Sequence, residues 1–134
     1  MEKTGHASKE KLVIKYPSPT KASTEKLELA AIAASLRIRL RSADMPVVMQ
    51  EHALRLTRSL LDSSTSRRPN LTVLARSLKK EFDRLNGPAW HCVAGKSFGS
   101  FVTHSPGGFV YFSVDSYSFL LFKTEVQLIS DDRT

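Results

Sequence analysis

The 134-residue sequence predicts an α+β domain in which the helices come before most of the strands instead of alternating with them. Two observations carry this prediction. Apolar residues recur with a helical period of about 3.6 between residues 44 and 85, and the period changes to about 2 after Pro88. The tripeptide Asn86-Gly87-Pro88, which suits the end of a helix, stands where the period changes. Elements segregated in this way are typical of helices packed on an antiparallel sheet.

The N-terminal region is predicted to lie outside this domain. Residues 1–26 are polar and contain Pro17 and Pro19, a composition typical of a disordered tail. Residues 27–36 (LELAAIAASL) have helical propensity and predict a short helix, for which no partner surface is evident. We therefore expect a disordered or partly helical extension over 1–36, one domain over 37–125 and a C-terminal tail over 126–134.

A strand and two amphipathic helices are predicted next. Residues 38–43 (IRLRSA) alternate apolar and basic side chains, the pattern of a strand with one solvated face. Asp44 and Pro46 suit the start of the first helix, and Asn70 suits the cap of the second. The expected buried stripes are Met49, Ala53, Leu56 and Leu60 in the first helix, and Leu71, Leu74, Ala75, Leu78, Phe82 and Leu85 in the second.

A four-stranded meander is predicted after Pro88. Trp90, Cys92 and Ala94 alternate with His91 and Val93, which indicates a first strand with two different faces. Three further strands are expected over 98–104, 109–114 and 117–123, joined by the turns SPGG (105–108) and Asp115-Ser116.

The Gly-rich stretch 95–108 fits neither a phosphate loop nor a catalytic centre. Its glycines lack the spacing of phosphate loops, and strands rather than helices follow them. His91 and Cys92 are neighbours in a strand, so their side chains point to opposite faces and cannot form a nucleophile–base pair. Cys92 is expected to be a small buried hydrophobe. The histidines show no metal-ligand spacing, so we expect no catalytic residue, no metal site and no cofactor.

The net charge of +7 is unevenly distributed. Residues 37–85 carry eleven basic and five acidic side chains, whereas residues 86–134 carry three basic and four acidic ones. Because the basic residues are separated from most of the aromatic ones, the pattern argues against a nucleic-acid surface. No apolar run approaches the length of a membrane span, and a single cysteine with no evident secretory signal favours a reducing compartment such as the cytosol.

One predicted hairpin carries a surplus of aromatic side chains. Only about half of them can face the helices, because side chains alternate along a strand. The others require a second cover, either another subunit or a ligand, unless the fold is a plain two-layer core with an incidental edge. A strand with free backbone groups beside an apolar wall accepts an extended peptide by strand addition. The residues concerned are Phe98, Phe101, Phe109, Tyr111 and Phe112.

The segment PAWHCVAGKSFGSFVTHSPGGFVYFSVDSYSFLLFK resembles the eight-kilodalton dynein light chain family. The family pattern is close to WHCIVG-(R/K)-x-FGSYVTHE, followed by FIYFY and ILLFKSG. This chain has WHCVAGKSFGSFVTH, FVYFS and FLLFKT at the corresponding places. KKEFD (79–83) is similar to the family's second helix, and SADMPVVMQ (42–50) is similar to its first. The likeness runs from about Ile38 to Thr124.

The resemblance implies a homodimer in which two helices pack on each sheet and the strand over 98–104 crosses to the partner's sheet. It implies two grooves at the dimer interface, each of which takes a disordered linear motif of a client, such as one containing Thr-Gln-Thr, as an added strand. Such a protein is a non-catalytic hub, bound to the dynein intermediate chain in a microtubule-associated motor of the cytoplasm and cytoskeleton. The alternative is a dedicated structural subunit of one assembly. No membrane or nucleic-acid partner is expected.

The resemblance also assigns roles to residues. The groove edge is expected at Lys96, Ser97, Phe98, Gly99, Ser100, Phe101, Val102, Thr103 and His104. The groove floor or nearby core is expected at Phe109, Tyr111, Leu120 and Phe122. The dimer interface is expected at His91, Phe98, Ser100, Phe101 and Val102. Because charging two facing His91 side chains costs desolvation and repulsion, the dimer is expected to loosen at acid pH.

Three departures from the family pattern bear on client choice. Phe101 stands where the family has Tyr, so a hydroxyl is missing at the interface. Ser113 stands where the family usually has a Tyr that lines the groove. Leu71-Thr72 stand at the start of the second helix, where the family commonly has an acidic–basic pair that brackets the client's glutamine. Peptide binding is still expected, because it rests mainly on backbone pairing.

Overall fold

The computed structural model describes residues 20–65 and 67–129 and confirms the α+β fold. In these residues, three helices and four strands follow one another along the chain. They are α2 (Lys21–Ser35), β1 (Ile38–Asp44), α3 (Val47–Asp62), α4 (Leu71–Asn86), β2 (Trp90–Gly95), β3 (Phe109–Val114) and β4 (Tyr117–Lys123). Most of the predicted N-terminal tail and the last residues of the predicted C-terminal tail lie outside the described residues.

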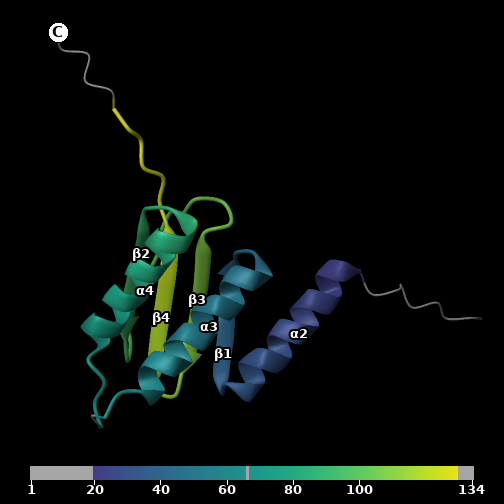
Figure 1. The fold of residues 1–134 in the computed structure, drawn as a ribbon, viewed down its shortest axis with the longest axis vertical. Helices are drawn as coiled ribbons and strands as arrows, with labels where there is room; N and C mark the ends of the chain where they lie inside the picture. Colours follow the sequence, from purple (N-terminus) through teal and green to yellow (C-terminus); the bar gives the residue numbers. More distant parts are fainter. Residues whose placement is uncertain (1–19, 66, 130–134) are drawn as a thin grey trace, which may run out of the picture.

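The strands form one antiparallel sheet in the order β1-β3-β4-β2, and α3 and α4 cover one of its faces (Figure 1). The predicted meander is therefore wrong, because β2 pairs with β4 and not with the segment that follows it. In the described part of the chain, each of the edge strands β1 and β2 has a strand neighbour on one side only. Their outer sides present unpaired backbone groups.

The predicted strand over 98–104 is also not formed. Residues 96–108 connect β2 to β3 without a strand of their own. A strand is stabilised by the backbone hydrogen bonds of a neighbour, and the described residues provide no paired neighbour for this segment. Residues 98–104 therefore follow β2 without a backbone hydrogen bond to the sheet, and backbone pairing with β4 resumes only at Ser105.

The core lies between the helices and the sheet. Val110, Phe112 and Val114 of β3 alternate toward the helices and are fully buried. Phe82 of α4 meets Trp90 of β2 edge to face, with ring centroids 4.9 Å apart. Burying each such side chain stabilises the fold by about 1.5–3 kcal/mol, so this layer contributes much of the free energy of folding.

The buried face of α3 differs from the predicted stripe. Ala53 is buried as expected, but Met49, Leu56 and Leu60 are only half-buried. The buried positions of α3 are Gln50, Ala53, Leu54 and Thr57. The helix contacts α2 as well as α4, and these two neighbours rotate its buried face away from the most apolar stripe. Thr57 is tolerated there because its hydroxyl donates to the Ala53 carbonyl at 2.8 Å.

The structure of α4 follows the sequence closely. The side-chain oxygen of Asn70 accepts a hydrogen bond from the Val73 N–H at 3.2 Å, which confirms the predicted cap. Leu74, Leu78 and Phe82 form the buried stripe. The last residue of the predicted stripe, Leu85, is 48% exposed, because the helix ends beyond the edge of the core.

The N-terminal helix is longer than predicted and has a partner surface. It begins at Lys21, so residues 21–26, expected in a disordered tail, are helical. The hydroxyl of Thr20 caps it by accepting from the Ser23 N–H at 3.0 Å. Leu29 and Ala33 are buried, and the helix contacts β1 and α3 at the side of the molecule opposite α4 (Figure 1).

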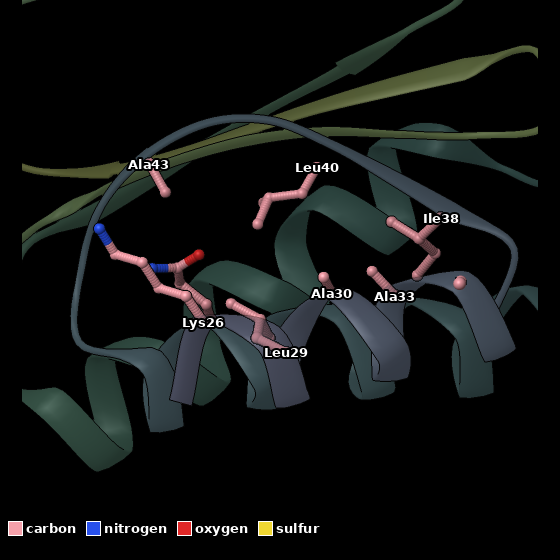
Figure 2. Close-up of a pocket in the computed structure, with 9 residues that line it drawn as sticks. Lys26, Leu29, Ala30, Ala33, Ile38, Leu40 and Ala43 are labelled. Atoms are coloured by element: carbon pink, nitrogen blue, oxygen red, sulfur yellow. The ribbon is translucent and has the colours of Figure 1, made fainter. Parts of the chain in front are cut away.

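Small side chains leave an apolar groove of about 490 Å³ between α2 and β1 (Figure 2). Ala30 and Ala33 of α2 face Ile38 and Leu40 of β1 across it, while Lys26 extends toward its Ala43 end. The groove lies on the helix-covered side of β1 and contains none of the predicted site residues. The groove results from incomplete packing of α2, because its alanine side chains are too small to fill the space between the helix and β1.

Candidate functional site

The predicted site lies mainly on the face of the sheet that turns away from the helices, which we call the open face. Because Val110, Phe112 and Val114 belong to the core, the alternate residues Phe109 and Tyr111 lie on the open face. The strand register places the remaining members of the open face beside them: Arg39 of β1, Ser113 of β3, Ser118, Leu120 and Phe122 of β4, and His91 and Val93 of β2. The structure thus brings together the expected floor residues Phe109, Tyr111, Leu120 and Phe122.

Both ends of the 96–108 segment touch aromatic residues of the open face. The Phe98 ring lies 6.1 Å from the Tyr111 ring, centroid to centroid. The His104 ring stacks on Phe109, with centroids 4.8 Å apart. Leu120, opposite Tyr111 in the register, is only 1% exposed. The segment therefore covers part of the open face, although no helix does so in the described residues.

The middle of this segment has no such contacts. The Phe101 side chain is as exposed as in an extended peptide, at 103%. Gly99, Ser100 and Thr103 are also exposed. Within residues 20–65 and 67–129, no backbone hydrogen bond joins 98–104 to another segment. The predicted groove edge is thus a stretch of free backbone donors and acceptors with a bare aromatic ring, which is costly for an isolated chain.

Asp44, at the end of β1, holds the far end of the segment in place. Its Oδ2 accepts a hydrogen bond from the Gly107 N–H at 3.1 Å and lies 3.9 Å from His104 Nδ1. His104 Nδ1 also lies 2.8 Å from the Ser105 carbonyl oxygen, to which it donates. The Ser105 N–H in turn donates to the Lys123 carbonyl at 2.7 Å. His104 is therefore positioned at one end of the exposed stretch.

His91, the expected interface residue, lies on the open face near the free edge of the sheet. Its ring lies 5.1 Å from the Phe122 ring, and its Nε2 is 2.9 Å from Thr124 Oγ1. The side chain is half-buried within this chain. A second molecule that covered the open face would bury it further.

A Lys–Asp pair on α4 fixes the strand that carries His91. The carboxylate of Asp83 accepts from the Trp90 N–H at 2.7 Å and from Lys79 Nζ at 2.8 Å. Lys79 Nζ also donates to the Trp90 carbonyl at 2.6 Å. Burial acts to raise the pKa of Asp83, but the hydrogen bonds from Lys79 and Trp90 outweigh it, and the pKa is lowered from its ordinary value of 3.8. The i, i+4 spacing of this pair within KKEFD is the sequence signal from which it could have been found.

Two further positions singled out in the sequence are Cys92 and the start of α4. Cys92 packs against the core, on the opposite face from His91, as predicted. Desolvation raises the pKa of its thiol to about 12, so it is a poor nucleophile at neutral pH. The first turn of α4 contains no acidic residue and begins with Leu71 and exposed Thr72.

In the described ranges, no helix is long and apolar enough to span a bilayer.

The arrangement of helices and strands is that of dynein light chain-like domains. The chain is similar to the dynein light chain-like domain of the Fasciola hepatica calcium binding protein FhCaBP2, with a TM-score of 0.61 and 21% identity. That match covers 67% of this chain and 94% of the solved domain. The DLC-like domain of CsTAL3 matches with a TM-score of 0.55 and 22% identity, over 66% of this chain and 93% of that one. At this identity the likeness defines the fold.

The chain belongs to the dynein light chain family. A sequence model of this family, described as dynein light chain type 1, matches residues 37–124. A dynein light chain of Schistosoma mansoni is 40% identical over 85 residues, which are 63% of this chain and 91% of that protein. The cytoplasmic dynein light chain 1 of Debaryomyces hansenii is 39% identical over 85 residues, or 63% of this chain and 89% of that protein. The resemblance read from the motifs is thereby confirmed.

Proposed function

We propose that this protein is a non-catalytic, dimeric adaptor that binds extended linear motifs of client proteins by strand addition. The observation that carries the proposal is the 98–104 segment. Its backbone is unpaired in the part of the chain that the structure describes, and it lies beside an apolar open face. A segment of this kind completes its hydrogen bonds by pairing with strands from other chains.

The first of these strands is supplied by a second copy of the chain. The outer edge of β2 is free in the described residues, and β2 leads directly into the unpaired segment. Exchange of the two 98–104 segments places each beside the partner's β2 and covers Phe101 and His91. A fully exposed Phe and an incompletely covered sheet face both favour this arrangement.

The second strand is supplied by the client. Once one side of the 98–104 segment pairs with the partner's β2, its other side remains free for an extended peptide. The groove edge is then Lys96 to His104, and Phe109 and Tyr111 form the floor. Two grooves per dimer hold two client chains side by side, so avidity raises the apparent affinity for dimeric clients.

The motor context follows from the family. Relatives are named cytoplasmic dynein light chains in Debaryomyces hansenii and Emericella nidulans, the latter 37% identical over 90 residues. We infer that this chain is likewise an accessory subunit of a microtubule-associated dynein in the cytoplasm. Its partners are then the dynein intermediate chain and other proteins with disordered linear motifs. The family supports a role without catalysis.

A dedicated structural subunit is the second candidate. The observation in its favour is the first turn of α4, where Leu71 and Thr72 replace the charged pair expected to bracket a client's glutamine. In this role the dimer forms but does not bind general client motifs.

The two candidates are separated by sedimentation and calorimetry on the full chain. An adaptor is expected to sediment as a dimer and to bind a Thr-Gln-Thr-containing peptide with micromolar affinity and two sites per dimer. A dimer that does not bind the peptide identifies the dedicated subunit. A monomer under all conditions contradicts both candidates.

Gly99→Lys provides a sharper test of the groove. A Cβ at Gly99 would have no atom within 4 Å among the described residues beyond its immediate chain neighbours, so the substitution is compatible with the fold of one chain. In the adaptor, the lysine projects from a strand paired on both sides, and peptide affinity is expected to fall by at least about tenfold. Ser59→Lys, on the exposed part of α3, is the matched control and retains binding. Equal affinities for the two variants place the peptide elsewhere.

A further inference from the structure

Three arginines gather around a pocket at one end of the open face. Arg37 follows α2, and Arg39 and Arg41 lie on β1; together with Ser113 and Asp115 they line a pocket of about 400 Å³. Arg39 is directly opposite Ser113 in the strand register. The register shifts by one residue at Arg41, and its Nε–H donates to Ser113 Oγ at 3.2 Å. The alternating IRLR pattern signals a basic strand face, but the pocket depends on the loop residues as well.

The charge of these arginines is only partly neutralised. Within residues 20–65 and 67–129, none of the three forms an ion pair, and the Nη groups of Arg41 donate no hydrogen bond. By contrast, the helix cations Arg55 and Arg58 have acidic partners at 2.7 Å. Asp115 supplies one negative charge to the pocket, so three guanidinium groups and one carboxylate leave a net charge of +2.

The pocket exists because residue 113 is small. In the family pattern this strand reads FIYFY, and here it reads FVYFS. A phenol ring at this position would extend into the space that the arginines surround. Ser113 instead is a small side chain that is only 8% exposed, and its hydroxyl lies 3.3 Å from Ser118 Oγ. It both opens the pocket and orients Arg41.

Arg37 is held in an unfavourable backbone conformation. Its φ of 58° lies in the left-handed region that favours glycine. The position follows the end of α2, where glycine is the usual residue. A glycine there would relieve the backbone but remove one cation from the pocket.

We propose that this pocket binds the phosphate of a phosphoserine or phosphothreonine in the client motif, an inference that rests on the proposed adaptor function. A phosphomonoester carries close to two negative charges at neutral pH, which matches the net +2 of the pocket. Guanidinium groups bind phosphate oxygens through paired N–H donors, and Arg41 has its Nη groups available. A carboxylate of the client would neutralise only half of the net +2 charge of the pocket.

The pocket also lies where a side chain of the bound client strand can reach it. Tyr111 and Ser113 are two residues apart on β3, a spacing of about 7 Å along a strand. A client strand that passes over Tyr111 therefore brings the side chain two residues further on to the arginines. The phosphate is expected to raise affinity at one position of the motif and not at its neighbours.

The experiment is a scan of phosphoserine through a Thr-Gln-Thr-containing peptide, with calorimetry on the full chain at fixed ionic strength. One position is expected to bind about tenfold or more tightly than the unphosphorylated parent, the gain of a charge-assisted contact. If the parent binds and no position gains affinity, the inference is overturned while the adaptor function stands. An equal gain from glutamate at that position also overturns it, because the pocket then selects carboxylates.

Variants assign the gain to the pocket. Arg39→Gln and Ser113→Tyr are each expected to reduce the ratio of phosphorylated to parent affinity to about threefold or less. Arg55→Gln, on α3 outside the pocket, removes the same charge and is expected to leave the ratio unchanged. A ratio that falls as far in Arg55→Gln as in Arg39→Gln reflects net charge alone and contradicts a built site.

A second measurement keeps the pocket testable if the parent peptide does not bind and the adaptor function fails. Inorganic phosphate is titrated into the full chain, and the Nε–H signals of Arg39 and Arg41 are followed by NMR. Saturable shifts that disappear in Ser113→Tyr support a phosphate pocket. Absence of shifts overturns it.

Discussion

Asp83 shows how one residue determines the position of a functional strand. Its carboxylate holds the Trp90 N–H, while Lys79 holds both that carboxylate and the Trp90 carbonyl. These bonds join α4 to the first residue of β2 and so set the place of His91 on the open face. Deleting the charge leaves a partly buried backbone N–H with a weaker acceptor.

Asp83→Asn is expected to lower the free energy of unfolding by about 1–2 kcal/mol at pH 7, through loss of charge-assisted hydrogen bonds. The folded pKa is lowered, so the stabilisation is present above the unfolded pKa near 3.8 and is lost as the pH falls through the folded value. The difference between wild type and variant should therefore be constant from pH 7 to about 5 and shrink below about pH 4. Urea unfolding at fixed protein concentration measures it.

Glu51→Gln is the control for this prediction. Glu51 pairs with Arg55 at the same i, i+4 spacing, but the two side chains are 37% and 53% exposed. An exposed pair contributes at most about 0.5 kcal/mol, so this variant should be nearly neutral. If the two variants were equally destabilised, the hydrogen bonds from Asp83 and Lys79 to Trp90 would add no stability beyond that of an ordinary i, i+4 ion pair.

At the level of elements, α2 lies before residues 37–124, which the family model matches. It is capped by Thr20, and it packs on β1 and α3 through few large side chains. Its apolar residues are mostly alanines, and its groove against β1 is incompletely filled. Leu29 is the one leucine of the helix that is buried, at 3% exposure, whereas Leu27 is 69% exposed. The helix is thus joined to the domain at one main point.

Leu29→Ala is expected to destabilise the protein by about 2 kcal/mol, because it removes the largest buried side chain of α2 and enlarges the existing groove. Leu27→Ala on the same helix changes the same side chain in solvent and should cost less than about 0.5 kcal/mol. Urea unfolding gives both values, and hydrogen exchange of the α2 amides reports whether the helix detaches. Indistinguishable variants would mean that α2 does not stabilise the domain.

At the level of the whole molecule, one chain leaves an open face that is only partly covered. The 96–108 segment contacts Tyr111 and Phe109, yet Phe101 is bare and His91 is half-buried. A bare aromatic ring is unfavourable for a monomer, and the proposed second copy would cover both side chains. In such a dimer, the two His91 rings would lie near the same interface.

The proposed dimer is therefore expected to dissociate on acidification. Sedimentation should give a dimer at pH 7 and increasing monomer toward pH 4, because two imidazolium groups at an apolar dimer interface lose hydration and repel each other. His91→Gln should remove most of this dependence. His104→Gln, which changes the histidine beside Asp44, should retain it. A wild-type dimer that is unchanged at pH 4 would contradict the role of His91.

The sequence by itself determined most of the helices and strands and the family. The 3.6-residue pattern of Leu74, Leu78 and Phe82 specified α4 because apolar periodicity reports directly on a buried helix face. The period of 2 specified the strands that carry the open face. Cys92 was correctly separated from His91, since neighbours on a strand point to opposite faces.

Only the tertiary structure decided how distant segments meet. The sheet order β1-β3-β4-β2 replaced the expected meander, because pairing depends on which edges are free and not on order along the chain. The 98–104 segment has the pattern of a strand but no paired neighbour in this chain, so pattern alone could not place it. The arginine pocket combines a residue after α2, two on β1 and two around a hairpin turn. Each of the three arginines is an ordinary solvated position in the sequence, and their charges combine only when the fold brings these segments together.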